Sequence, residues 1–326
     1  MRTPAGVLVL LLSPLLAGAA ESPPPEHGRV RFVPVDDQAD VPQRYRLEPR
    51  TFEYDLTHRF DLEDSGVRVF RLTFPSAVES PYRENNTVHA EYYRPVGDGP
   101  FPAVIVLDIT GGDQMLSRSL SSHLAHRGVA CLFVQMAYYG PRRPPGSNLK
   151  LLSPDLNHTF AAIRQTVLDL RLAAAWLEAR PEVDRKRLGI LGTSLGSFMA
   201  ALTAECEPRL DRVVLLLGGG GLVDGYWDHP QVLPYRKPYE QLGGTKDALK
   251  KLLAPVDPLT KADNLKKHRL LMMAGRKDQV VPAKMAEMLW EASGRQKIQW
   301  FDCGHYDAVI HIVEALDLAT KHLTEP

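Results

Sequence analysis

After Pro95, apolar runs of strand length alternate with helical segments as far as the end of the chain. The runs, in chain order, are FPAVIVLDI, GVACLFVQM, RLGILG, RVVLLLGGG, HRLLMMAG and KIQWFDCG. The first of these runs is continuous and rich in β-branched residues, which is typical of a strand buried on both faces of a parallel sheet. We expect helices at about 115–127, at 159–180 and from Ser194 onward. The alternation predicts an α/β chain with a doubly wound, mostly parallel sheet, whose strands end at one ligand-binding edge.

The first residues have a different character. Arg2 precedes the apolar run GVLVLLLSPLLAGAA, which ends in small residues. A short basic start, an apolar core and a small-residue end are typical of a secretory signal peptide, here residues 1–20 with cleavage after Ala19 or Ala20. A membrane anchor is the alternative, but the run is too short to span a bilayer and Pro14 interrupts it. We therefore expect export to the periplasm or the medium, without a stable membrane anchor after cleavage.

A region of weak periodicity follows. Residues 21 to about 50 are rich in proline and charge, which predicts a flexible or loosely wrapped lead-in. The segments TFEYDLTHRF, GVRVFRLTFPS and TVHAEYYRP then alternate as half-buried strands do. The predicted organisation is therefore a lead-in with an antiparallel β extension at 21–87 and an α/β domain at 88–326.

One connection in the α/β domain is unusually long. After the strand at about 212–218, some fifty residues precede the next apolar run, against the usual ~2–6 for such connections. Part of this segment must supply the crossover helix, and the rest, within an insertion at 219–265, is either a lid or a surface excursion. Among its aromatic and imidazole side chains are Tyr226, Trp227, His229 and Tyr235.

Charge and cysteine content exclude several classes of function. The 39 basic and 39 acidic residues give a net charge of zero and form no long like-charge block, so no nucleic-acid partner is expected. The cysteines, Cys131, Cys206 and Cys303, are odd in number and form no CxxC pair, which argues against a disulfide framework and a zinc site. No metal or cofactor is expected.

The sequence GTSLG contains Ser194 between Gly192 and Gly196. It follows the apolar run RLGIL and continues into SFMAALTAE, which has the composition of a helix. A sharp strand-to-helix turn of this kind needs small residues on both sides, raises the serine above the sheet edge and points a helix N-terminus at it. The motif predicts that Ser194 is a nucleophile.

A serine hydroxyl becomes a good nucleophile only when an oriented base takes its proton. Asp278 follows the run RLLMMAG, and His305 follows the last run, KIQWFDCG. The order serine, aspartate, histidine is that of a known catalytic arrangement. Asp224 is the second choice for the acid and Asp302 the third, since each also lies near a strand end.

From about Val88 to the C-terminus the chain resembles the α/β-hydrolase superfamily, in particular esterases near the dienelactone hydrolases and acetyl-xylan esterases. The resemblance rests on PAVIVLDITGG, ILGTSLGSFMA, LMMAGRKDQVVP and FDCGHYDAV. It implies a Ser-His-Asp triad in which Ser194 is the nucleophile, His305 the base and acid, and Asp278 the carboxylate that orients the imidazole.

Such a site needs two backbone N–H groups for the oxyanion. Leu195, directly after the nucleophile, is one candidate, and Gly111 or Thr110 in the stretch Thr-Gly-Gly is the other. The sequence departs here from the commoner His-Gly pattern, because Asp108 and Ile109 precede Thr110.

For substrate contacts the sequence offers the segment MAYYGPRR, which follows a strand, and the long insertion. Tyr138, Tyr139 and Arg142 either line an acyl or leaving-group pocket or belong to a surface loop, and Trp227 is the candidate from the insertion. The predicted function is a secreted serine hydrolase that cleaves a small-molecule or saccharide carboxylic ester. The alternatives are a peptidase, thioesterase or acyltransferase, and a non-catalytic binding protein on the same fold.

Overall fold

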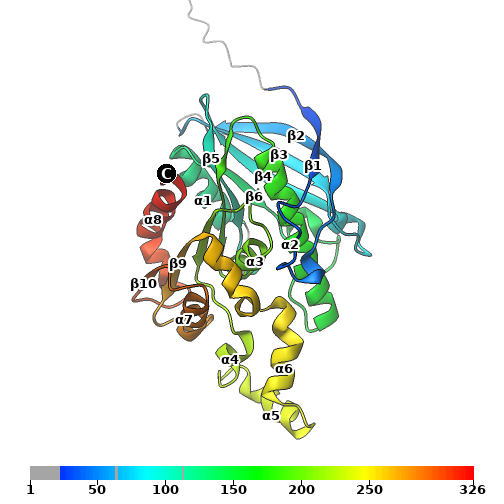
Figure 1. Ribbon diagram of the computed structural model, residues 1–326, viewed down its shortest axis with the longest axis vertical. Coiled ribbons are helices and arrows are strands. Elements are labelled where there is room, and N and C mark those ends of the chain that lie inside the picture. The colour runs from blue at the N-terminus through cyan, green and yellow to red at the C-terminus, as the bar shows by residue number, and fades with distance from the viewer. Residues whose placement is uncertain (1–22, 63–64, 112–113) are drawn as a thin grey trace, which may run out of the picture.

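The computed structural model describes residues 23–62, 65–111 and 114–326 (Figure 1). The predicted signal peptide at 1–20, and Gly112 of the predicted Thr-Gly-Gly loop, lie outside these residues.

A ten-stranded sheet runs through the described part of the chain. Its strands are β1 (Glu26–Phe32), β2 (Arg50–Leu62), β3 (Val67–Pro75), β4 (Thr87–Pro95), β5 (Phe101–Leu107), β6 (Ala130–Val134), β7 (Val183–Thr193), β8 (Arg212–Leu216), β9 (Arg269–Gly275) and β10 (Lys297–Phe301). They are ordered β1-β2-β3-β4-β6-β5-β7-β8-β9-β10. The pairs from β1 to β4, and β4 with β6, are antiparallel, and all pairs from β6 to β10 are parallel. The predicted mostly parallel sheet with an N-terminal β extension is confirmed.

Helices cover both faces of this sheet (Figure 1). They are α1 (Met115–His126), α2 (Leu156–Glu178), α3 (Leu195–Ala204), α4 (Leu222–Tyr226), α5 (Leu233–Gln241), α6 (Lys246–Leu253), α7 (Ala283–Ala292) and α8 (Ile312–Thr324), with short 3-10 segments η1 (Gln43–Tyr45), η3 (Arg83–Asn86), η4 (Gly140–Arg142), η5 (Ala254–Val256), η6 (Pro258–Lys267) and η7 (Asp307–His311). α1 and α8 pack on one face, while α2, α3 and α7 pack on the other. Within the described residues, none of these helices has both the length and the hydropathy needed to cross a membrane.

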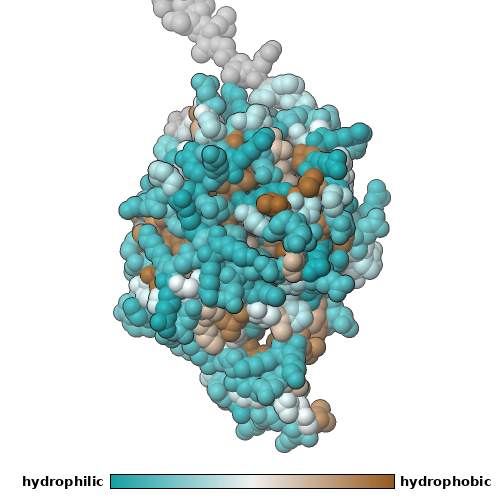
Figure 2. Space-filling view, in the orientation of Figure 1, coloured by the Kyte–Doolittle hydropathy of each residue, from teal (hydrophilic) through white to brown (hydrophobic). Residues whose placement is uncertain are grey.

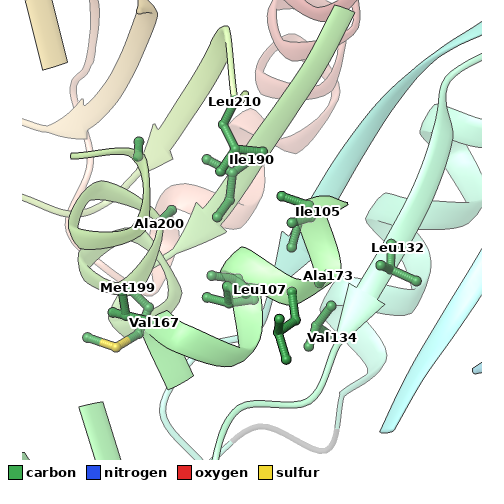
Figure 3. Packing of buried hydrophobic residues seen from close by; sticks show 14 of the residues in the cluster. Ile105, Leu107, Leu132, Val134, Val167, Ala173, Ile190, Met199, Ala200 and Leu210 are labelled. Atoms are coloured by element: carbon green, nitrogen blue, oxygen red, sulfur yellow. The ribbon is translucent and has the colours of Figure 1, made fainter. Parts of the chain in front are cut away.

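β5 shows why the apolar runs lack polar alternation. Ile105 and Leu107 belong to the core under α2 and α3, which Figure 3 shows from close by. Val104 and Val106, on the opposite face, belong to the core under α1 and α8. Both faces of the strand are therefore buried, as its sequence predicts. The chain order reverses around β5, which lies between β6 and β7, and ligands bind at such a switch point in open α/β sheets.

The N-terminal lead-in is packed rather than loose. Within residues 23–50, β1 pairs along its length with β2, and the Tyr45 side chain is buried. The guanidinium of Arg171, itself buried in α2, donates from Nη1 to the Tyr45 carbonyl at 2.5 Å and to Gln38 Oε1 at 2.9 Å. The expectation of a flexible or loosely wrapped segment is wrong here, because a buried cation in α2 takes its acceptors from this stretch.

The insertion at 219–265 projects from the body as α4, α5 and α6 (Figure 1). Helices α5 and α6 bury none of their residues, and on the face shown in Figure 2 the projecting part is mainly hydrophilic. The two ends of the insertion are held together by Asp257, whose carboxylate oxygens accept from the N–H groups of Gly221 and Leu222, both at 2.7 Å.

We expect Arg171→Leu to lower the free energy of unfolding by about 3 kcal/mol, because it removes the charged donor from the buried Tyr45 carbonyl and from Glu207 Oε2. Urea unfolding of the whole chain measures this loss. Arg29→Leu is the matched control, since its pair with Glu53 is mostly exposed and is expected to contribute about 0–1 kcal/mol. Equal losses in the two variants would contradict the anchoring role of Arg171.

Candidate active site

Ser194 lies at the turn between β7 and α3, in a backbone conformation that residues with side chains rarely adopt. Its φ is 53° and its ψ is −117°. β7 is held between β5 and β8, and the Ser194 N–H donates to the carbonyl of Leu216 at 2.8 Å. A strained non-glycine residue persists only where its surroundings over-determine it, and strain of this kind concentrates at functional sites.

The two motif glycines allow the turn to close. A Cβ at Gly192 would lie 2.0 Å from the carbonyl oxygen of Gly196. A Cβ at Gly196 would lie 2.6 Å from the carbonyl oxygen of Asp108, at the end of β5. The second contact shows that the first turn of α3 lies directly against the loop after β5, which brings that loop beside Ser194.

His305 and Asp278 form a continuous hydrogen-bonded chain with Ser194. His305 Nε2 lies 3.0 Å from Ser194 Oγ, and His305 Nδ1 lies 2.7 Å from Asp278 Oδ2. In the tautomer with its proton on Nδ1, the imidazole donates to Asp278 and accepts from the Ser194 hydroxyl. The other oxygen of Asp278 accepts from the N–H groups of Val280 and Val281, each at 2.8 Å, so the carboxylate is oriented as well as buried.

The other two candidate acids lie elsewhere. Asp224 is paired with Lys246 at 2.8 Å and Lys250 at 2.7 Å, and Asp302 is exposed and paired with Lys277 at 2.9 Å. Of the three aspartates, only Asp278 contacts His305 by hydrogen bond. Asp278 follows β9, and His305 follows β10, the next strand along the chain. This position of Asp278 was therefore the sequence signal that identified the acid.

The predicted oxyanion donors have different surroundings. Leu195 is the first residue of α3, so its N–H is among those at a helix start that have no acceptor within the helix. The Gly111 N–H donates instead to the hydroxyl of Tyr139 at 3.2 Å, whereas Thr110 lines the cavity beside Ser194. Ile109 also lines this cavity, and sequence reasoning did not select it. Gly196 lies close to the carbonyl of Asp108, the residue before Ile109, which places Ile109 beside the nucleophile turn.

A cavity of about 450 Å³ opens beside Ser194 and His305. Among the described residues that line it, His305 is the single one that can carry a charge below the pH at which tyrosine ionises, and most of them are aliphatic or aromatic. The cavity extends on the α1 and α8 side of the sheet. Its lining residues are Ile109, Thr110, Leu116, Leu120, Thr193, Ser194, Leu216, Leu217, Met273, Val280, Phe301, His305, Tyr306, Ala308, Val309, Ile312 and Ala315.

The aromatic residues predicted to contact substrate do not line this cavity. Tyr138 is buried against the rings of Tyr82 and His158. Tyr139 is buried and accepts from the Gly111 N–H, so its hydroxyl positions the loop after β5. Burial also raises the pKa of the Tyr139 phenol.

Arg142 and Trp227 have structural partners as well. Arg142 forms a buried ion pair of 2.6 Å with Asp169 of α2. Trp227 lies beneath the guanidinium of Arg236, 4.7 Å from the ring centroid, within the insertion. Sequence position alone placed these residues near the correct sheet edge but could not tell a pocket wall from a packing contact.

The insertion contacts the loop that carries Asp278. The Tyr226 hydroxyl donates to the carbonyl of Val280 at 2.7 Å, and His229 Nε2 lies 2.9 Å from the carbonyl of Gln279. Burial, with a contribution from the Asp278 charge, raises the pKa of Tyr226 to about 12. No residue of 219–265 lines the cavity beside Ser194, so in this structure the insertion supports the acid loop and does not cover the cavity.

Cys303 is buried in the core beneath α8, and burial raises the pKa of its thiol. This placement is that of a packing residue. Within the described residues, no three His, Cys, Asp or Glu side chains are grouped as metal ligands.

Together these groups can activate a hydroxyl nucleophile beside an apolar cavity. A base lies within hydrogen-bonding distance of Ser194 Oγ, a buried carboxylate orients that base, and a helix N-terminus begins at the next residue.

Two known families match parts of the chain. The family described as "Alpha/beta hydrolase domain containing 18" matches residues 74–219, and the "Prolyl oligopeptidase family" matches residues 161–317. An uncharacterized protein of Mycobacterium tuberculosis is 26% identical over 208 residues, which are 63% of each chain. The 2,6-dihydropseudooxynicotine hydrolase of Paenarthrobacter nicotinovorans is 32% identical over 135 residues, 41% of this chain and 32% of the relative. The chain thus spans at most about 63% of the length of these curated relatives.

Solved structures share the fold at low identity. Acetyl xylan esterase 1 from Thermoanaerobacterium superposes with a TM-score of 0.63 at 19% identity, covering 81% of this chain and 87% of the esterase. A putative dienelactone hydrolase from Klebsiella pneumoniae superposes with a TM-score of 0.51 at 18% identity, covering 80% of this chain and 99% of the other.

We expect Gly196→Ala to destabilise the protein by about 2 kcal/mol or more, because the added methyl group collides with the backbone after β5. In an unobstructed helix the same substitution would stabilise the protein by about 1 kcal/mol, so the sign of the change in unfolding free energy is itself informative. Thermal and urea unfolding measure it. Gly243→Ala is the control: it has open space but a φ of 86°, and is expected to cost about 1 kcal/mol. A neutral or stabilising Gly196→Ala would show that the turn is less tight than described.

Proposed function

The chain belongs to the α/β-hydrolase superfamily, and on that premise we propose that it is a serine hydrolase of uncharged carboxylic esters. The observation that carries the proposal is the hydrogen-bonded chain from Ser194 Oγ through His305 to the buried Asp278. The apolar cavity beside it favours an uncharged substrate, because a charged group would lose its hydration there without gaining an ionic partner. We extend the proposal to an exported enzyme on the pattern of residues 1–20 alone.

In the proposed mechanism Ser194 Oγ attacks the ester carbonyl carbon while its proton passes to His305 Nε2. The buried Asp278 carboxylate stabilises the imidazolium that forms. The N–H of Leu195, together with one N–H from the segment 109–110, receives the oxyanion of the tetrahedral intermediate. The bond to the alcohol oxygen then breaks as His305 returns the proton to it, which leaves an acyl group on Ser194.

Water completes the cycle by the same route. His305 takes a proton from water, the oxygen of that water attacks the acyl carbon, and Ser194 leaves with the proton from His305. The products are a carboxylic acid and an alcohol, and no metal or cofactor enters any step.

A peptidase is the second candidate, because the prolyl oligopeptidase family matches residues 161–317. The same three side chains would then cleave an amide, whose leaving amine needs the proton from His305 more strongly. Thioester hydrolysis and acyl transfer use the same acyl-enzyme and differ in the leaving group or the acceptor.

We expect Ser194→Ala to lower kcat/KM for p-nitrophenyl esters by about 10⁴-fold or more, since it removes the nucleophile. A fluorophosphonate probe should label the wild-type chain on Ser194 and leave the variant unlabelled. Parallel amide and thioester substrates separate the esterase from the peptidase and thioesterase. Wild-type and variant rates that agree, or the absence of a Ser194 adduct in folded protein, would favour a non-catalytic binding protein.

Replacement of the acid tests the orientation of the base. We expect Asp278→Asn to lower kcat for the same esters by about 10³–10⁴-fold with little change in KM, because the imidazole loses its orienting charge. Asp224→Asn and Asp302→Asn are matched controls and should stay within about twofold of wild type, since both aspartates pair with lysines away from His305. If Asp224→Asn were the damaging variant instead, the assignment of the acid would be wrong.

A further inference from the structure

The cavity beside Ser194 continues from the catalytic groups into the layer of α1 and α8. Thr110 and His305 lie at one end of its lining together with Ser194, and Tyr306 and Val309 are exposed at its opening. Further in, the wall is formed by buried residues from both helices, including Leu120 and Ala315.

Two helical stripes form this inner wall. α1 contributes Leu116 and Leu120, which are four residues apart and therefore lie on one face of the helix. Ala308 in η7 is followed along the chain by Ile312 and Ala315 of α8, again at helical spacing. Both sets of side chains therefore line the same cavity. Residues of the sheet form its floor.

Small residues at 308 and 315 leave that space unfilled. α1 and α8 pack against each other, and α8 belongs to the same core as α1 through Ala315 and Ala319. At Ala315 and Ala308 the side chain ends at Cβ, whereas leucine or isoleucine at either position would extend into the cavity. Interiors of proteins are otherwise close-packed, and a cavity of about 450 Å³ joined to a nucleophile has the size of a ligand pocket.

We propose that this cavity is the acyl-chain pocket, that it accepts a linear acyl group of medium length, and that Ala315 and Leu120 set the length limit. The proposal rests on the ester hydrolysis proposed above and adds the substrate class. If each methylene takes about 30 Å³, the volume of a water molecule in the liquid, the cavity of about 450 Å³ has room for at most about fifteen methylenes, so a chain of about six to ten carbons fits within it. An acetyl group would leave most of it empty.

The chemistry of the wall sets the preference for acyl length. Each methylene transferred from water to an apolar surface raises kcat/KM by about fourfold, the equivalent of about 0.8 kcal/mol. The gain continues until the chain reaches the far wall, where further atoms collide with packed side chains. This expectation differs from the acetyl substrate named for the structural neighbour acetyl xylan esterase 1.

The test is a series of p-nitrophenyl esters from acetate to dodecanoate, with kcat/KM measured for wild type and for variants of the full chain. Wild type should rise from acetate to hexanoate or octanoate by about fourfold per methylene and then fall. Ala315→Leu should abolish the rise and move the optimum to acetate or butanoate. Leu120→Ala should move the optimum to longer chains by about two carbons, which a misfolded variant would not do.

Val313→Leu is the matched control on the same helix, because Val313 is exposed and does not line the cavity. It should keep the wild-type profile. A thermal unfolding midpoint close to that of wild type shows that each variant is folded.

Two outcomes overturn the proposal in different ways. If wild type cleaves acetate at least as well as octanoate, or if Ala315→Leu keeps the wild-type profile, the acyl pocket is wrong while the esterase stands. If no ester is cleaved and the fluorophosphonate does not label Ser194, the esterase and the acyl pocket both fall.

Discussion

The strained turn at Ser194 is the constraint on which the rest of the site depends. The backbone there has a φ of 53° and is held between β7, whose neighbours are β5 and β8, and the first turn of α3. Only the absence of side chains at Gly192 and Gly196 lets the strand, the helix and the loop after β5 approach so closely. Since strain of this kind costs about 1–3 kcal/mol, the parallel sheet and its helices must supply the stability that maintains it.

Successive hydrogen bonds orient the side chains that act on Ser194 Oγ. The N–H groups of Val280 and Val281 hold Asp278, Asp278 holds His305, and His305 reaches Ser194. The insertion reaches the same loop, through Tyr226 and His229, and so contributes to the site without lining it. A long excursion after β8 therefore has a structural role at the acid loop.

The helices on the two faces of the sheet have different roles at the site. Helices α2 and α3, with the lead-in fastened by Arg171, form the larger core and carry the helix N-terminus that faces the site. Helices α1 and α8 form the smaller core, which is interrupted by the apolar cavity. One face of the sheet thus positions the nucleophile, and the proposed acyl group occupies the other. The proposed acyl pocket and the helix that begins at the strained Ser194 turn therefore lie on opposite faces of the same sheet.

The sequence by itself determined the sheet type, the place of Ser194 and the partners His305 and Asp278, because apolar periodicity and chain order report which strand ends meet at one edge. Apart from these three residues, it did not determine which side chains of distant segments contact one another. The packing of the lead-in on Arg171, the use of the Gly111 N–H by Tyr139 and the cavity between α1 and α8 all depend on such contacts. Only the tertiary structure decided that Tyr138 and Trp227 pack away from the cavity while Ala315 borders it, since a side chain's surroundings depend on which helices pack beside it.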